Sequence, residues 1–510
     1  MSFAKTKTVA LFGISTKVVE IQVAISSGQP ILNIVGLASK AVSESRDRIR
    51  AAISSIGLSL PPKRITVNLS PADIIKEGNH YDLPIALCML AAIGIIEPEK
   101  IINTISLGEL TLDGRINYTS GILPAGIMAK ENNFELVCPA DAVIETAFLK
   151  DELKIYPVSS LIDVIDLYTK HKQNHAILTT KEQIINTDIT YDQKYCMSNI
   201  RGQQFAKRAM EIAASGGHNI ILIGSPGTGK SMLARALQTI MPPLSYQEIL
   251  ELSIIKSVAG TIKDERLSNE RPFRSPHHSS SIPAIVGGGR NAKPGEISLA
   301  HNGILFLDEF AEFPVSVLDA LRQPLETGTI EVARAESHIT YPAAFQLVAA
   351  MNPCKCGYFW DPTKCCVKVP VCGSQYMAKI SGPIMERIDI QVAIYNSGVD
   401  IFSIDNSDKA EASDIIRKRV LRTRKIQQDR YKTKNINLNK DINGSMFEEF
   451  CQLDEKTKTL VEKASNKMEF SMREYHKILK VARTIADMDE SQNIAQDHIL
   501  EALSYRIAKN

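Results

Sequence analysis

The 510-residue sequence is short of aromatic side chains, which make up 6% of it, and it contains a single tryptophan. It also lacks any run of the roughly 18–20 apolar residues that a membrane span needs. The longest apolar stretch, residues 83–96, is interrupted by Pro84 and Gly94. The first eight residues are too few and too polar for a secretory signal. These absences predict a cytoplasmic globular protein with no membrane contact.

The chain also has almost no net charge. The 59 lysines and arginines almost balance the 57 aspartates and glutamates, which gives a formal charge of +2. Overall charge therefore identifies no partner, and any basic surface must be local. The chain shows no internal repeat and no low-complexity tract, and its length predicts about three domains.

The chain divides into segments of different pattern. Residues 1–168 mix strands with helices, and residues 169–195 are polar, as expected of a linker. Residues 196–395 alternate strands and helices, whereas residues 405–510 show only helical periodicity and high charge. Within the first segment the expected strands are 18–25, 31–35 and 65–68, and the expected helices are 38–57 and 82–95.

A phosphate-binding loop is the most informative motif. The pattern G-x-x-x-x-G-K-[ST] is matched without departure, between an apolar run at 219–223 and a helical run from 232. Backbone amides of such a loop surround phosphates, the lysine reaches the β and γ oxygens, and the hydroxyl ligates Mg²⁺. The sequence therefore predicts binding of ATP with Mg²⁺ by Gly224, Ser225, Pro226, Gly227, Thr228, Gly229, Lys230 and Ser231.

Polar residues follow two further apolar strands. Asp308 and Glu309 end the run 304–307, and Asn352 ends the run 346–351. Ligands of parallel sheets bind at the carboxyl ends of the strands. We expect Asp308 to hold Mg²⁺ through water, Glu309 to polarise the attacking water, and Asn352 to contact the γ-phosphate or orient that water.

These motifs together resemble an AAA+ ATPase, a class whose sites are usually completed between the subunits of a ring. The resemblance implies an arginine donated in trans, for which Arg387 is the candidate; the alternative is a surface ion pair with Asp389 or Glu386. It also implies an arginine in cis from the helical lid. Arg473 is the first candidate for that role and Arg483 the second.

Longer stretches narrow the resemblance. They include Val35–Leu37 with Ala41–Arg46, Ile65–Asp73, Gly216–Asn219, Arg271–His278, Ala350–Cys354 and Val481–Asp487. Together they resemble the magnesium-chelatase-like AAA+ proteins of the ComM/YifB family over nearly the whole chain. The family implies an α/β protein with three parts: a Lon-protease-like α+β domain (ribosomal protein S5 domain 2-like) over 1–168, an AAA+ core over 196–395 and a helical lid over 405–510. It further implies a homo-hexameric ring that drives branch migration of DNA during natural transformation.

The Lon-like fold raises the question of proteolysis. Gly108–Arg115 resembles that fold, but the turn at 78–82 reads Gly-Asn-His-Tyr-Asp, where Lon-type proteases carry their nucleophilic serine. Ser43, Ser45 and Ser70 lie where capping roles explain them. We therefore expect a domain without protease activity.

One segment has the composition of a nucleic-acid contact. Residues 271–294 contain four arginines or lysines, two histidines, three consecutive glycines and no acid, which favours phosphate binding. An ordinary surface loop is the alternative. Residues 328–342 predict a hairpin, which in similar ring helicases points into the central pore. The predicted DNA contacts are Arg271, Arg274, His277, His278, Arg290, Lys293 and Arg334.

Cysteine, by contrast, is locally abundant. Five of the nine cysteines lie between 354 and 372, which in a cytosolic protein indicates metal before disulfides. Four thiolates suit tetrahedral zinc in a structural role. The preferred ligands are Cys354, Cys356, Cys366 and Cys372, with Cys365 as a substitute, and reduced thiols in a proline-stiffened loop are the alternative.

Three functions share this nucleotide site. A DNA motor is favoured because residues 271–294 carry no acid. A protein-remodelling ATPase is the alternative; its pore loop would need an exposed aromatic, whereas Tyr341 and Phe345 look buried in strands. Magnesium insertion into a porphyrin ranks last, because the chain has no metal-insertion site of its own.

Overall fold

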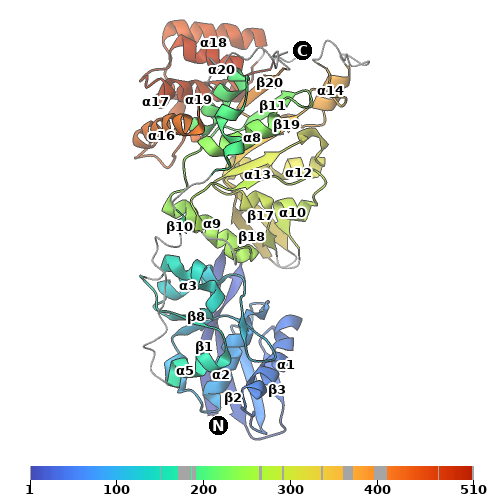
Figure 1. Ribbon diagram of the computed structural model, residues 1–510, viewed down its shortest axis with the longest axis vertical. Helices are drawn as coiled ribbons and strands as arrows, with labels where there is room; N and C mark the ends of the chain where they lie inside the picture. Colours follow the sequence, from blue (N-terminus) through green and yellow to red (C-terminus); the bar gives the residue numbers. More distant parts are fainter. Residues whose placement is uncertain are drawn as a thin grey trace.

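The computed structural model describes most of the chain as three bodies that follow one another along the long axis (Figure 1). The residues that it describes are 2–149, 151–169, 185–186, 191–262, 267–289, 292–334, 337–359, 371–395, 411–468 and 470–507. Most of the predicted linker and the middle of the cysteine-rich segment lie outside these ranges. Among the described residues, no helix combines the length and the apolar character needed to cross a membrane.

The N-terminal body is built on a mixed seven-stranded sheet in the order β3-β4-β2-β1-β5-β8-β9. β1 and β2 form a long antiparallel hairpin, and its turn uses Gly13 at φ +63°, a conformation that glycine adopts readily. Thr6 and Thr8 of β1 can be buried because their hydroxyls donate to the carbonyls of Ile101, just before β5, and of Ser106 in β5. The strands are β1 (Ser2–Phe12), β2 (Ser15–Ser26), β3 (Leu32–Val35), β4 (Arg64–Ser70), β5 (Thr104–Ser106), β8 (Glu135–Pro139) and β9 (Ile155–Val158).

Helices pack on this sheet as the predicted 38–57 and 82–95 segments indicate. α2 (Asp82–Ala92) is buried at every position, which fits its almost wholly apolar sequence. Arg48 of α1 (Lys40–Ser55) holds Asp82 through two hydrogen bonds of 2.7 and 2.9 Å, so α1 is fixed to the start of α2. The remaining helices are α3 (Ile122–Glu131), α4 (Val143–Thr146) and α5 (Leu161–Thr169).

The central body contains a five-stranded parallel sheet in the order β13-β16-β19-β11-β20. Its inner strands β16, β19 and β11 are buried at every position, as continuous apolar runs predict for a parallel sheet covered on both faces. Its carboxyl edge therefore collects the ends of the three strands that carry the predicted site. The strands are β11 (Ile220–Gly224), β13 (Phe273–Arg274), β16 (Ile304–Leu307), β19 (Gln346–Met351) and β20 (Ile390–Ile394).

Helices and hairpins surround this sheet. The predicted hairpin is present as β17 (Thr329–Arg334) and β18 (Ser337–Pro342), and a second, short one joins β14 (Gly287–Gly288) to β15 (Lys293–Pro294). The helices are α7 (Gln204–Gly216), α8 (Lys230–Ile240), α9 (Tyr246–Ala259), α10 (Ile282–Val286), α11 (Glu296–Leu299), α12 (Val315–Ala320), α13 (Arg322–Thr327), α14 (Val371–Met377) and α15 (Gly382–Met385).

The third body is helical and shares an apolar core with α7, α8 and the sheet. α19 begins with a capping box in which Ser471 and Glu474 satisfy each other's backbone amides. The helices are α16 (Ser413–Arg430), α17 (Met446–Phe450), α18 (Glu455–Met468), α19 (Met472–Met488) and α20 (Gln496–Ser504). A mixed α/β chain with a parallel central sheet and C-terminal helices is thus confirmed; the Lon-like assignment and the domain boundaries stay predictions.

The N-terminal and central bodies meet where α9 packs on α3 (Figure 1). Ile249 and Leu252 of α9 join an apolar cluster of the N-terminal body. The hydroxyl of Ser257 donates to the carboxylate of Glu145 at 2.7 Å, and its carbonyl accepts from the amide of Gly121 at 3.1 Å. This contact fixes the N-terminal body to the body that carries the phosphate-binding loop.

Candidate nucleotide site

The phosphate-binding loop lies between the buried strand β11 and helix α8, which begins at Lys230. Gly227 and Gly229 have φ values of +80° and +83°, which bulkier residues rarely adopt. No heavy atom lies within 4 Å of the position that a Cβ would take at either glycine. The loop therefore turns its backbone toward open space at the start of a helix, where anions bind favourably.

The side chain of Lys230 lies inside the loop. Its Nζ donates to the carbonyls of Gly224 (2.7 Å) and Ser225 (2.9 Å), and to Oδ1 of Asn352 (3.2 Å). Burial lowers the pKa of Lys230, and the nearby charge of Asp308 opposes that shift. Asn352, which follows β19, therefore lies beside Lys230 of the loop, as expected from the sequence.

Ser231 and Asp308 form the second pair at this edge of the sheet. The Ser231 hydroxyl donates to Oδ2 of Asp308 at 2.8 Å, which joins the start of α8 to the end of β16. A hydroxyl and a carboxylate oxygen are hard ligands of the kind that Mg²⁺ prefers. The donor set and the open loop thus fit ATP with Mg²⁺.

Glu309 has a strained backbone and an unexpected partner. Its φ is +51°, a left-handed conformation that is uncommon for residues other than glycine. Nδ1 of His278 lies 2.9 Å from its carboxylate. His278 was predicted to contact DNA, and the sequence carried no signal that it would lie against Glu309, 31 positions further on.

The segment 386–389 sends three charged side chains to three different partners. Glu386 pairs with Arg473 at 2.5 Å, and Arg387 pairs with Glu326 of α13 and donates to the carbonyl of Pro383. Burial favours a raised pKa for Asp389, but the hydrogen bond and charge of His218 lower it to about 2. Arg387 is therefore not paired with Asp389 or Glu386, the alternative expected from the sequence.

The lid contains the two candidates for the arginine that acts in cis. Arg473, at the start of α19, is exposed and contacts the segment that carries Arg387. Arg483 is buried within the lid, where it holds Asp487 at 2.9 Å and the carbonyls of Ser491 and Gln492. These bonds give Arg483 a structural role, so of the two only Arg473 remains a candidate for the arginine in cis.

Lys477 of α19 was missed by the sequence analysis. Its Nζ donates to the carbonyl of Ile388 at 3.1 Å, and burial lowers its pKa to about 8. It therefore links the lid to the residue next to Arg387. The sequence around it gave no sign of this contact.

Arg271 does not fit its predicted role in DNA binding. Its side chain is buried, donates to the carbonyls of Pro242 (2.7 Å) and Asn302 (2.6 Å), and pairs with Glu248 at 2.9 Å. A guanidinium with these partners holds α9 to the sheet and has no free face for a phosphate. We therefore correct this assignment to a structural one.

The other predicted DNA contacts differ in accessibility. Arg274 is half-buried and forms two 2.6 Å hydrogen bonds with Glu296, whereas His277 is exposed beside Ser279. Arg290 lies outside the described residues, and so does the side chain of Arg334, whose backbone ends β17. Lys293 is exposed on β15.

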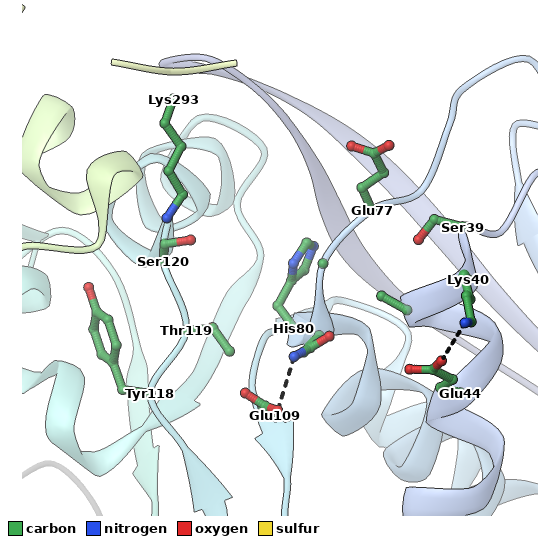
Figure 2. A pocket seen from close by; sticks show the side chains of 13 residues that line it. Ser39, Lys40, Glu44, Glu77, His80, Glu109, Tyr118, Thr119, Ser120 and Lys293 are labelled. Carbon is green, nitrogen blue, oxygen red and sulfur yellow. Dashed lines mark hydrogen bonds and ion pairs between the residues drawn. The ribbon is translucent and has the colours of Figure 1, made fainter. Parts of the chain in front are cut away.

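Lys293 points toward a cavity of about 710 Å³ that the N-terminal body lines (Figure 2). The turn around His80 forms part of its wall. The buried hydroxyls of Ser39 and Thr119 line it too and have no hydrogen-bond partner in the described part of the chain. A DNA contact through Lys293 would therefore lie between the two bodies.

The cysteine cluster is partly described. Cys354, Cys356 and Cys372 bring their Sγ atoms within 4.8 Å of one another. Cys366, the fourth predicted ligand, and its substitute Cys365 lie outside the described residues. Three of the predicted zinc ligands thus lie together.

The fold and this site define a P-loop protein with ATPase machinery: a parallel sheet whose edge gathers Lys230, Ser231, Asp308 and Asn352. Family models agree with that class. Residues 196–400 match "Magnesium chelatase, subunit ChlI", residues 21–142 match "Subunit ChlI of Mg-chelatase", and residues 410–506 match "Magnesium chelatase, subunit ChlI C-terminal".

Full-length relatives identify the family. The chain is 40% identical to the competence protein ComM of Haemophilus influenzae, over 99% of this chain and 98% of that protein. It is 38% identical to YifB of Escherichia coli K12, over 99% and 97% of the two chains. This protein belongs to the ComM/YifB family of magnesium-chelatase-like AAA+ ATPases. A more distant similarity, 27% identity over 36% of this chain and 19% of the other, joins it to the DNA replication licensing factor mcm-6 of Caenorhabditis briggsae.

Proposed function

We propose that this chain is an ATP-driven ring motor that acts on DNA and promotes branch migration, as a helicase, during natural transformation. Relatives named as a competence protein and as DNA replication licensing factors support DNA as the substrate. The observation that carries the proposal is the 2.9 Å contact between His278 and Glu309. It connects the acid-free segment 271–294 to the residue that is expected to activate water.

The residues at the sheet edge divide the work of hydrolysis. Bound ATP with Mg²⁺ supplies the phosphoryl group and part of the neutralising charge. Lys230 would contact phosphate oxygens once it exchanges its loop carbonyls for them, and Ser231 with Asp308 would hold the ion. Glu309 would accept a proton from the attacking water, which Asn352 helps to orient.

A ring is part of the proposal because AAA+ sites are usually completed by an arginine of the neighbouring subunit, and Arg387, held by Glu326 of α13 in its own chain, is the candidate. In a homo-hexamer, Arg387 of one subunit would stabilise the charge that develops at the phosphate of its neighbour. Its neighbour in sequence, Glu386, binds Arg473 of the lid, so lid position and arginine position are linked.

DNA binding is expected to weaken when Arg274 and Lys293 are both changed to alanine. On single-stranded DNA each phosphate contact that is lost removes about 0.7 unit from the slope of log affinity against log salt, so the double variant should lose about 1.4. Fluorescence anisotropy with labelled single-stranded DNA at several salt concentrations measures this. Lys418→Ala on the exposed face of α16 is the matched control. Unchanged affinity and slope in the double variant would place the DNA site elsewhere.

His278→Ala is expected to raise ATP turnover in the absence of DNA. The His278–Glu309 pair is partly exposed, and such pairs contribute about 0.2–1 kcal/mol, which corresponds to about a 1.4- to fivefold change. Stimulation by DNA should shrink by the same factor, because Glu309 is already released. Lys418→Ala, on the exposed face of α16, serves as the control. Lower turnover without DNA would show that His278 supports Glu309 rather than restraining it.

Protein remodelling, the alternative function, gains no support from the hairpin. Tyr341 and Phe345 are 1% and 5% exposed, so neither presents an aromatic ring to a pore. The hydroxyl of Tyr341 instead donates to the carbonyl of Ala292 at 2.8 Å and fixes the hairpin to the segment before β15.

A further inference from the structure

Three thiols meet beside the nucleotide site. Cys354 and Cys356 follow β19, whereas Cys372 lies in α14, and all three Sγ atoms lie within 4.8 Å of one another. The Sγ atoms of Cys354 and Cys356 are 3.0 Å apart, and none of the three cysteines forms a disulfide within the described residues. Ligands of a tetrahedral zinc ion with Zn–S bonds of about 2.3 Å lie about 3.8 Å from one another. The 3.0 Å separation and the 4.8 Å upper limit for the three sulfurs lie on either side of that value.

The thiol cluster belongs to a turn that touches the phosphate-binding loop. The amide of Gly357 donates to the carbonyl of Cys354 at 3.0 Å and closes the turn. Gly357 has φ +84°, and a Cβ there would lie 2.6 Å from Cδ of Pro226. Only glycine allows this approach. The turn is therefore packed directly on the loop that receives the phosphates.

The same turn is joined to Asn352. Asn352 lies two residues before Cys354 and accepts the hydrogen bond from Lys230. An ion bound by the thiols would therefore restrain two parts of the site: Pro226 in the loop, and the amide of Asn352 that contacts Lys230.

We propose that Cys354, Cys356 and Cys372 bind a soft divalent cation, zinc, and that the bound ion holds the Gly357 turn against the phosphate-binding loop. On binding, each thiol releases its proton to solvent and its thiolate donates an electron pair to the ion. The fourth coordination position is left for a further ligand. The ion is structural and takes no part in hydrolysis, and the inference does not depend on DNA being the substrate.

Metal content tests the site. The full-length protein, purified without added chelator, is expected to carry about one zinc per chain by elemental analysis, and Cys354→Ser, Cys356→Ser and Cys372→Ser should each lose most of it. Cys138→Ser and Cys196→Ser, at cysteines outside the cluster, should keep it. Absence of zinc from the wild type, or its retention in a Cys354→Ser/Cys356→Ser double variant, would overturn the proposal.

Cobalt spectroscopy keeps the test valid if a serine variant does not fold. Co²⁺ added to wild-type protein stripped of metal should give thiolate-to-metal charge-transfer absorption that added zinc removes. Absorption typical of oxygen ligands alone would contradict thiolate binding.

Nucleotide affinity tests the mechanical link. Stripped protein, returned to buffer with Mg²⁺, is expected to bind a fluorescent ATP analogue about tenfold more weakly, and stoichiometric zinc should restore the affinity. The exposed Cys356→Ser variant should show the same weakening without chelator. Equal affinity with and without zinc would refute the link to the loop, whereas a failure of DNA to stimulate turnover would leave this result unchanged.

Discussion

Glu309→Gln is expected to reduce ATP turnover by about 10²–10⁴-fold, the contribution that a general base typically makes. Gln keeps the size and polarity of the side chain but cannot accept the proton of water. The residues that would hold ATP and Mg²⁺ are unaffected, since Lys230 bonds to Asn352 and Ser231 to Asp308. ATP binding should therefore be retained. Steady-state phosphate release and equilibrium binding of a fluorescent ATP analogue separate the two effects.

Glu312→Gln is the matched control for that variant. Glu312 lies three residues further on, and its carboxylate pairs with Lys379 at 3.1 Å on the surface. It should keep normal turnover. If Glu309→Gln turned over ATP at the rate of this control, Glu309 would not be the base.

Arg387→Ala is expected to lower turnover by about 10³-fold or more, as removal of an arginine that stabilises phosphoryl transfer does. The change also frees Glu326, which is largely exposed and can be solvated, so the fold should persist. The informative experiment mixes Arg387→Ala with Glu309→Gln subunits. In a mixed ring, some interfaces then combine an intact Arg387 with an intact Glu309 of the neighbour. Activity should reappear in the mixture although each variant alone is inactive.

Arg422→Ala supplies the control for Arg387. Arg422 is an exposed arginine of α16 that pairs with Glu490, away from the nucleotide site. Its variant should match the wild type alone and in mixtures. Mixtures that stay inactive, with circular dichroism showing folded subunits, would contradict an arginine that acts between subunits.

The nucleotide site could be predicted from the sequence because its signals are local. A phosphate-binding loop needs glycines, a lysine and a hydroxyl at fixed spacing, and all stand within eight residues of 224–231. Asp308 and Asn352 follow unbroken apolar strands, and a parallel sheet brings such strand ends together. The register that pairs β19 with both β11 and β16 delivers them beside Lys230.

Roles that depend on distant partners could not be predicted. Arg271 looked like a DNA contact because its own segment is basic, but its partners Glu248 and Asn302 come from other segments. β1 was not predicted either, because the alternating Lys and Thr of its first half look like a polar terminus. Pairing with β2 and β5 makes it an inner strand of the sheet. In both cases the contacts that define the role come from segments distant in the sequence.

The central claim is that DNA controls the ATPase of this chain. The direct measurement is the ATPase rate of the full-length protein with single-stranded, duplex and four-way-junction DNA, and without DNA, across salt concentrations. We expect at least one of these DNAs to stimulate ATP turnover, and branched DNA to stimulate it most. The stimulation should disappear as the salt concentration rises. A rate indifferent to all three DNAs at every salt concentration would contradict the account and favour a protein substrate.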